Sequence, residues 1–357
     1  MWLSGRGRGL IVRLLDQVAQ CRAPFIVGTS AGERTHLSGA MELREDVLRC
    51  ATRYVLTDDL TGLCTDLAHS RGTRVYGCMD LLRIPATRLW IEWSYGPWLD
   101  RLRDYGLDGA TNVLEAAGRF GILMYASADG QRGTMRAFWN RGPLDTDVSA
   151  SAVESHFRFD GGLEHDQPSC RDCLRVTDVL RDADGRFARS FHFAFERSWQ
   201  DYYSRTLGTG DRYAAVRLAS AGALAMAVPF LLAFLLLLLN RDGLPQESPR
   251  LERLNCARAR SGKAPLLEHV EVRAPIFVSS AASEDRSTER GTRVPPRLHH
   301  VRGHLVRRAE QIYWRVPHLR GSARRGVLQS RTVTWTVSGA QQRYRATPLE
   351  MTNTRPE

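Results

Sequence analysis

Hydrophobic and polar positions alternate with two different periods along the first two hundred residues. Apolar side chains three and four residues apart indicate helices, whereas short runs of branched and aromatic residues between polar ones indicate strands. A turn at 126–132 joins two of the strands, which predicts a β-hairpin. Helices are predicted over 10–20, 41–55 and 109–118, and strands over 89–93, 120–125, 134–139 and 187–195. The polar stretch 141–172 fits neither period.

The most apolar segment is 218–239, which has no charged residue and only Ser220 as a conventional polar side chain. It is long enough to cross a bilayer, which needs about 20 apolar residues. The other interpretation is a long helix that is buried on all sides in a globular fold. Arginines flank both ends, so the orientation of a span is poorly specified. We favour the buried helix in a cytoplasmic protein, and a single-pass span at 218–239 in the inner membrane is the alternative.

Beyond residue 240 the chain becomes basic. Residues 241–357 hold 22 Lys and Arg against 11 Asp and Glu, whereas residues 1–240 hold 28 of each, so the net charge of +11 comes entirely from the last third. A helix is predicted over 250–260, a strand over 266–272, a hairpin over 298–308 and 312–315, and a closing strand over 327–337.

Together these patterns predict an α+β fold with a mixed N-terminal domain, a long apolar central helix and a small basic β-rich C-terminal domain. The boundaries that we expect are 1–208 for the mixed α/β domain, 209–240 for the apolar helix, 241–340 for the basic domain and 341–357 for a disordered tail.

The basic domain contains the strongest candidate for a binding site. Residues 291–335 include ten arginines, four histidines and a single acid, Glu310, with Tyr and Trp interleaved. Guanidinium groups neutralise phosphates, and aromatic rings stack on unpaired bases. The other interpretation is a solvated basic sheet whose tryptophans fill a small core. The residues predicted to contact nucleic acid, DNA or RNA, or another polyanion are Arg302, His304, Arg307, Tyr313, Trp314, Arg315, His318 and Arg320.

Two patterns would suit an enzyme instead. The histidines at 299, 300, 304 and 318 could hold a metal or supply a general base. A metal site needs further ligands, but there is no cysteine nearby and only one acid, so we expect no metal and no cofactor there. Glu92 lies between Trp90 and Trp93, and a buried carboxylate at this position could serve as an acid or base. In an alternating strand such a glutamate faces solvent, and this is the arrangement that we expect.

The seven cysteines are odd in number and scattered, which argues against a disulfide framework and for a reducing compartment. Cys170 and Cys173 form a single CxxC, so a structural zinc would need further ligands such as His165, His156 or His192. We expect both cysteines to be free thiols.

Three stretches resemble an uncharacterised family of phage and prophage proteins from GC-rich bacteria. They are Trp-Ile-Glu-Trp at 90–93, Leu-Leu-Glu-His-Val-Glu-Val at 266–272, and Val-Arg-Gly-His followed by Pro-His-Leu-Arg-Gly within 301–321. The resemblance implies a cytoplasmic protein expressed from a phage genome, and it supplies no catalytic residues. From the arginines and aromatic residues of the basic domain, the function we expect is non-enzymatic binding of nucleic acid or another polyanion, with the oligomeric state left open.

Overall fold

A computed structural model describes most of the chain. The described residues are 13–21, 25–27, 34–35, 40–70, 75–107, 118–140, 148–164, 174–175, 185–195, 197–240, 244–275, 297–301, 303–308, 311–315, 318–320 and 322–327. They belong to two compact units. The first combines Met1–Ile276 with His304–Arg315, and the second combines Phe277–Gly303 with Val316–Glu357.

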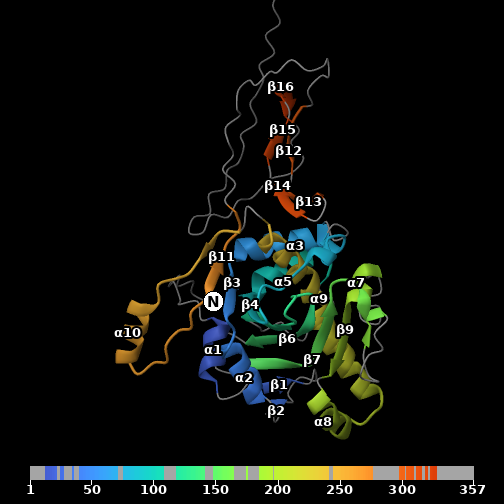
Figure 1. Cartoon of the computed structure of the whole chain (residues 1–357), viewed down its shortest axis with the longest axis vertical. Coiled ribbons are helices and arrows are strands. Elements are labelled where there is room, and N and C mark those ends of the chain that lie inside the picture. The colour runs from blue at the N-terminus through green and yellow to red at the C-terminus, as the bar shows by residue number, and fades with distance from the viewer. Residues whose placement is uncertain are drawn as a thin grey trace, which may run out of the picture. The chain divides into compact units, whose positions relative to one another are not determined.

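The first unit is built on a mixed sheet of eleven described strands, which confirms the α+β class (Figure 1). The main path runs β10-β11-β3-β4-β5-β6-β7-β1-β2, and β9 pairs with both β7 and β8. The strands are β1 Phe25–Val27, β2 Arg34–Thr35, β3 Thr52–Leu56, β4 Arg88–Ser94, β5 Arg119–Ala126, β6 Arg132–Asn140, β7 Val148–Arg158, β8 Leu174–Arg175, β9 Phe191–Phe195, β10 Gln246–Glu247 and β11 Val270–Val272.

Helices cover both faces of this sheet. The α-helices are α1 Leu14–Gln20, α2 Ala40–Leu48, α3 Asp58–Ser70, α5 Tyr95–Asp104, α7 Gly185–Ser190, α8 Arg197–Leu207, α9 Asp211–Leu238 and α10 Glu252–Arg260, with short 3-10 turns η1 Met79–Leu81 and η2 Gly162–Glu164. On the α1 and α2 side, Trp90 packs edge-on against Phe138 with their ring centroids 5.3 Å apart. A Cβ on Gly121 would meet the Trp90 ring at 2.6 Å, so only glycine fits beneath it.

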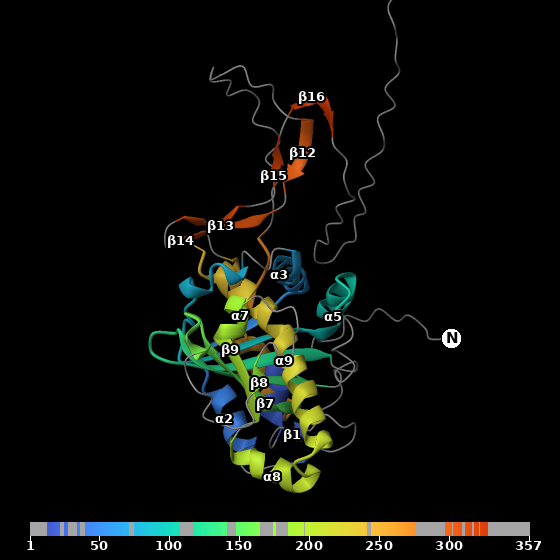
Figure 2. The ribbon, with the colours of Figure 1, turned by 90° about the vertical axis from the view of Figure 1, so that its right-hand side faces the viewer.

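The long helix α9 fills the opposite side of the sheet (Figure 2). Phe230 lies 4.6 Å from the Trp93 ring of β4, and Phe234 lies 5.7 Å from the Tyr54 ring of β3, measured between centroids. Within its most apolar 18-residue window, 83% of the residues are buried. A helix that is apolar all round needs this kind of enclosure when it lies in a globular protein. By length and composition alone, the same helix could also cross a membrane.

The sequence patterns predict several elements correctly. Helix α1 falls within 10–20, β4 covers 89–93, and β5 and β6 form the predicted hairpin. Helix α9 and helix α10 also lie where they were expected.

Two predictions are wrong in detail, and a stretch that fits neither period contains a strand. The expected helix at 41–55 ends at Leu48, and 52–56 is instead strand β3, which pairs in parallel with β4 and β11. Residues 185–190 form α7, so only 191–195 of the expected strand is a strand. The unassigned stretch after 141 contains β7, whose serines at 149, 151 and 155 are buried although they look polar in sequence.

The C-terminal strands divide between the two units. In the second unit β12 Arg297–Val301, β15 His318–Arg320 and β16 Ser322–Val327 form a three-stranded sheet. In the first unit β13 His304–Arg308 pairs with β14 Gln311–Arg315. The predicted strand 298–308 is therefore two strands that belong to different sheets. Residues 109–117 of the predicted helix at 109–118, the tail 341–357 and most of the closing strand 327–337 lie outside the described residues.

Candidate nucleic-acid interface

The β13–β14 hairpin holds five of the predicted contact residues. Its antiparallel register places His304 opposite Arg315, Val306 opposite Tyr313, and Leu305 opposite Trp314. Because successive side chains of a strand point to opposite faces, each such pair shares one face of the hairpin. The register therefore separates the predicted residues into an inner set and an outer set.

The inner face packs against the body of the first unit. Leu305, Ile312 and Trp314 are 5%, 7% and 7% exposed, respectively. The Trp314 ring is thus enclosed, which corrects its predicted role as a stacking platform. The interpretation in which tryptophan fills a small core describes this residue better.

Arg307 extends from the same face and anchors the hairpin. Its guanidinium donates to both carboxylate oxygens of Asp80 in η1 at 2.9 Å, and to the carbonyl oxygen of Gly77 at 2.9 Å. Such bidentate geometry fixes orientation as well as distance. Arg307 is therefore engaged with the protein itself and positions the hairpin, while its side chain is 37% exposed; its phosphate contact stays a prediction.

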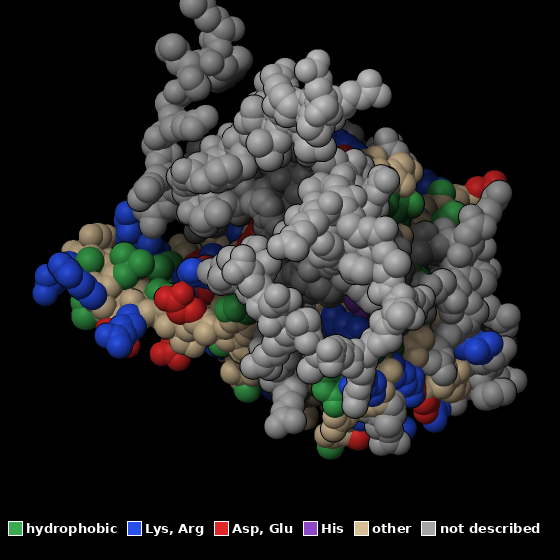
Figure 3. Space-filling view, turned by 90° about the horizontal axis from the view of Figure 1, so that it is seen from above, with side chains coloured by type: hydrophobic (Ala, Val, Ile, Leu, Met, Phe, Trp, Pro, Cys, Tyr) green, Lys and Arg blue, Asp and Glu red, His purple; other side chains and the backbone are tan. Residues whose placement is uncertain are grey.

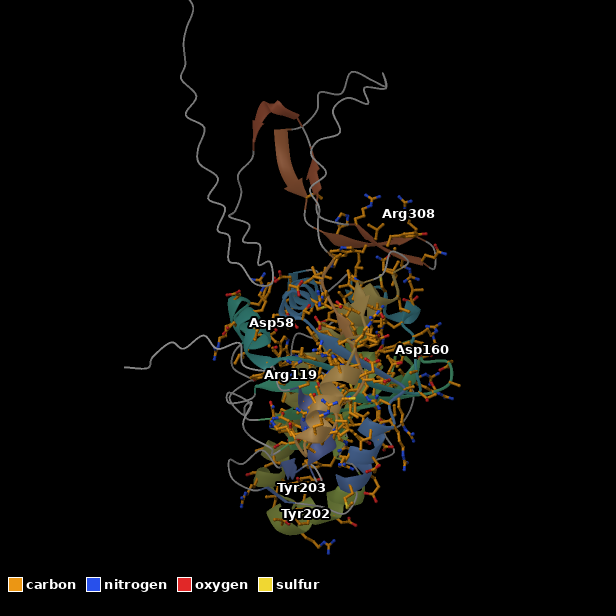
Figure 4. The ribbon with its side chains drawn as sticks, turned by 90° about the vertical axis from the view of Figure 1, so that its left-hand side faces the viewer. Asp58, Arg119, Asp160, Tyr202, Tyr203 and Arg308 are labelled. Atoms are coloured by element: carbon orange, nitrogen blue, oxygen red, sulfur yellow. The ribbon has the colours of Figure 1, made fainter. Side chains whose placement is uncertain are left out.

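The outer face gathers positive charge around one aromatic ring. It presents His304, Arg308 and Arg315, with Tyr313 between them. The two arginines are exposed, whereas His304 and Tyr313 are half-buried, and Figure 4 labels Arg308 at the surface of the hairpin. The Tyr313 hydroxyl donates to the Gln311 side-chain oxygen, which steadies the ring. The described residues of these two strands include no acidic side chain.

The other predicted contact residues lie elsewhere. His318 and Arg320 belong to β15 in the second unit, and Arg302 lies outside the described residues. His299 and His300 are in β12, also in the second unit. The outer face thus retains His304, Tyr313 and Arg315 from the predicted set, and it adds Arg308.

A buried polar cluster surrounds Glu92, and this corrects the expectation that Glu92 faces solvent. Its side chain is fully buried on the α1 side of the sheet. The carboxylate accepts hydrogen bonds from the backbone N–H groups of Leu14 at 3.2 Å and Leu15 at 2.7 Å, and from the Trp90 indole at 3.0 Å. Its Oε1 atom also accepts a hydrogen bond from the Nε of Arg119 at 2.8 Å (Figure 4 labels Arg119).

These four donors occupy the acceptor positions of the Glu92 carboxylate. An ionised carboxylate offers about four lone-pair positions, so little capacity remains for a substrate proton or water. Its partners join the start of α1 to the centre of the sheet, in β4 and β5. The geometry therefore gives Glu92 a structural role, as the buried acceptor that holds α1 on the sheet.

A second cluster lies beside the first and includes His269 and Asp16. Arg13 donates to Asp16 at 2.7 Å and to the His269 ring, and the other Asp16 oxygen accepts the Leu267 N–H at 3.0 Å. Burial raises the pKa of Asp16, although Arg13 opposes this effect. Burial and then the Arg13 charge lower the pKa of His269. The cluster therefore ties residues 267–269 to α1 through a neutral imidazole.

The metal alternatives find no support in the described residues. Within that part of the chain no group of three or more His, Cys, Asp or Glu side chains is placed to hold an ion. His156 lies 3.2 Å from Glu154, and His192 is buried opposite it in the β7–β9 register. Cys170 and Cys173 lie outside the described residues.

Two sequence signals could have identified these arrangements. In the strand at 89–93, apolar residues occur at both odd- and even-numbered positions, so both faces of the strand carry them. This is typical of a strand covered on both faces, and it leaves no solvent-exposed face for Glu92. In the hairpin, Arg307 and Arg308 are consecutive residues, so their side chains lie on opposite faces of the strand. Only Arg308 shares a face with Tyr313. No local signal links Asp16 to residue 267.

No family model, curated protein or solved structure matches this chain. The resemblance to a phage family therefore stays a prediction.

Proposed function

We propose that this chain is a non-enzymatic nucleic-acid-binding protein that uses the outer face of the β13–β14 hairpin. One observation supports this most directly. His304, Arg308 and Arg315 surround the Tyr313 ring on a face with no described acid, while the opposite face attaches the hairpin to the body. Arginine beside an aromatic platform suits a phosphate next to an unpaired base.

The anchoring of the hairpin strengthens the proposal. A two-stranded hairpin alone is marginally stable in water. Here three buried apolar side chains and the Arg307–Asp80 pair fix the strands, so the outer side chains need little further ordering to meet a ligand.

Fluorescence anisotropy with labelled single- and double-stranded DNA and RNA, across a salt series, tests this function. Replacing Arg308 and Arg315 by Ala should lower the slope of log affinity against log salt by about 0.7 for each lost contact on single strands. Tyr313→Ala should weaken single-strand binding by about 1–3 kcal/mol with little change in slope, whereas Tyr313→Phe, the matched control, keeps the ring and the affinity. Wild-type protein that binds none of these probes at low salt refutes the proposal.

We further propose that the protein is cytoplasmic. The enclosure of α9 by the sheet and α3 supports this, because its apolar surface is already covered within the first unit. The inner-membrane alternative uses the same helix as a span, and resistance of the protein to carbonate extraction from membranes would favour that alternative.

A further inference from the structure

A projecting arm leaves the sheet between β10 and β11. These two strands pair antiparallel, Gln246 with Val272 and Glu247 with Glu271, and the 22 residues between them, 248–269, form the arm. Helix α10 lies at its end, set apart from the sheet (Figure 1). No residue of α10 is buried.

Polar clamps hold α10 in place of a hydrophobic core. The Asn255 side chain accepts the Leu266 N–H at 2.7 Å and donates to the Leu266 carbonyl at 3.0 Å. Arg258 Nε donates to the Ala264 carbonyl at 2.8 Å. A free nine-residue helix is marginal in water, so these clamps and the paired base of the arm preorganise it. One side of α10 is thereby used internally and the other is left exposed.

The exposed side of α10 is a stripe with an arginine at each end. Arg253, Cys256, Ala257 and Arg260 follow i, i+3, i+4, i+7 spacing, and all four are exposed. The two arginines lie about 10 Å apart along the axis, with small side chains between them. Figure 3 shows Lys and Arg side chains gathered at the left-hand end, the side on which α10 lies in Figure 1.

The whole arm is positively charged. It holds five cations against two acids, a net charge of +3; they are Arg250, Arg253, Arg258, Arg260 and Lys263, with Glu252 and Glu268. It presents a single exposed large apolar side chain, Leu254, and contains no Phe, Tyr or Trp. A membrane-surface helix needs a broad apolar face, and protein hot spots are rich in aromatic residues. The arm has neither a broad apolar face nor such aromatic residues, so its positive charge fits a polyanion better than a membrane surface or a protein partner.

We propose that the arm inserts α10 into the major groove of duplex DNA, with Arg253 and Arg260 contacting phosphates on the two sides of the groove. The major groove of B-DNA is about 12 Å wide and admits an α-helix, whereas the major groove of duplex RNA is too narrow. Small residues in the centre of the stripe let the helix approach the base edges. This inference rests on the proposed function. It names duplex DNA as a ligand that binds the exposed side of α10, a surface separate from the outer face of the hairpin.

The test compares three double variants with wild-type protein by anisotropy on a labelled DNA duplex in a salt series. Arg253→Ala/Arg260→Ala removes the stripe and spares the Arg258 clamp. Arg308→Ala/Arg315→Ala removes the outer-face charges. Arg103→Ala/Arg205→Ala is the matched control, because both arginines are exposed and each contacts only its own helix among the interactions seen. Circular dichroism confirms folding of each variant.

We expect the arm variant to lower the salt slope by about 1.8, at about 0.9 per lost phosphate contact, and to weaken duplex binding at least tenfold at 0.1 M salt. Arg253→Lys/Arg260→Lys should retain most of the slope. An arm variant that matches the control overturns the inference, while weaker binding by the outer-face variant alone leaves the proposed function standing. Equal arm dependence for duplex RNA or for anionic phosphatidylserine vesicles also overturns the inference. Wild-type protein that binds no nucleic acid overturns both.

Discussion

Replacing Glu92 by Gln should destabilise the first unit severely. The carboxylate is fully buried and pairs with Arg119, whose side chain is 7% exposed. Removing one partner of a buried ion pair leaves the other charged without compensation, which costs about 3–5 kcal/mol. Gln is nearly the same size and can still accept from Trp90 or Leu15, so the loss reports charge and acceptor capacity more than packing.

Urea denaturation followed by circular dichroism measures this change in the free energy of unfolding. The matched control is Glu247→Gln, because Glu247 pairs with Arg273 at the surface, where such pairs contribute about 0–1 kcal/mol. The double variant Glu92→Gln/Arg119→Met removes both charges of this pair and should lose less than the two single variants added together, by about 0.5–3 kcal/mol. A loss below 1 kcal/mol for Glu92→Gln, or strict additivity in the double variant, would refute the structural role of Glu92.

Three further predictions concern other parts of the first unit. Because the folded pKa of His269 lies below its ordinary value of 6.5, the unfolded chain takes up a proton first as pH falls. Stability should therefore decrease from pH 6.5 down through the folded pKa, and His269→Asn should flatten this dependence in urea titrations. Leu235→Arg places a charge at a position in α9 that is 1% exposed, so this variant should unfold. Wild-type protein should stay in the supernatant after carbonate washing, and its recovery in the membrane pellet would contradict a buried α9. Trp314→Ala should lower the thermal midpoint, whereas Tyr313→Ala should change it little, and the opposite ranking in a melting experiment would disprove the assignment of inner and outer faces.

Local patterns predicted the elements whose neighbours in sequence are also their neighbours in space. The β5–β6 hairpin is such a case, because its turn and its alternating strands lie within 22 residues, 119–140. The sequence does not reveal strand β7 because five of its eight buried positions are serine or alanine, which fit between two covered faces without being strongly apolar. Small side chains of this kind weaken the alternation on which strand prediction depends.

The candidate site was predictable as a basic, aromatic hairpin but not as a surface with two faces. Because side chains alternate between the two faces along each strand, Arg308 and Tyr313 lie on one side of the hairpin. Arg307 and Trp314 lie on the other. Which side faces the protein depends on Asp80, 227 residues away from Arg307. The arm shows the same limit, since the sequence indicates a basic helix at 250–260 but not that β10 and β11 hold it clear of the sheet.

The long-range pairing at the base of the arm has a consequence for synthesis on the ribosome. Strand β11 pairs in parallel with β3, and His269 contacts Arg13 across 256 residues of chain. At about 5–20 residues per second, β3 waits roughly 11–44 s for its partner. During that interval β3 is an open edge strand, which is a site for mispairing with other chains. A chain that stops before residue 270 never closes this edge, so premature termination there should yield aggregation-prone fragments rather than a shorter folded protein.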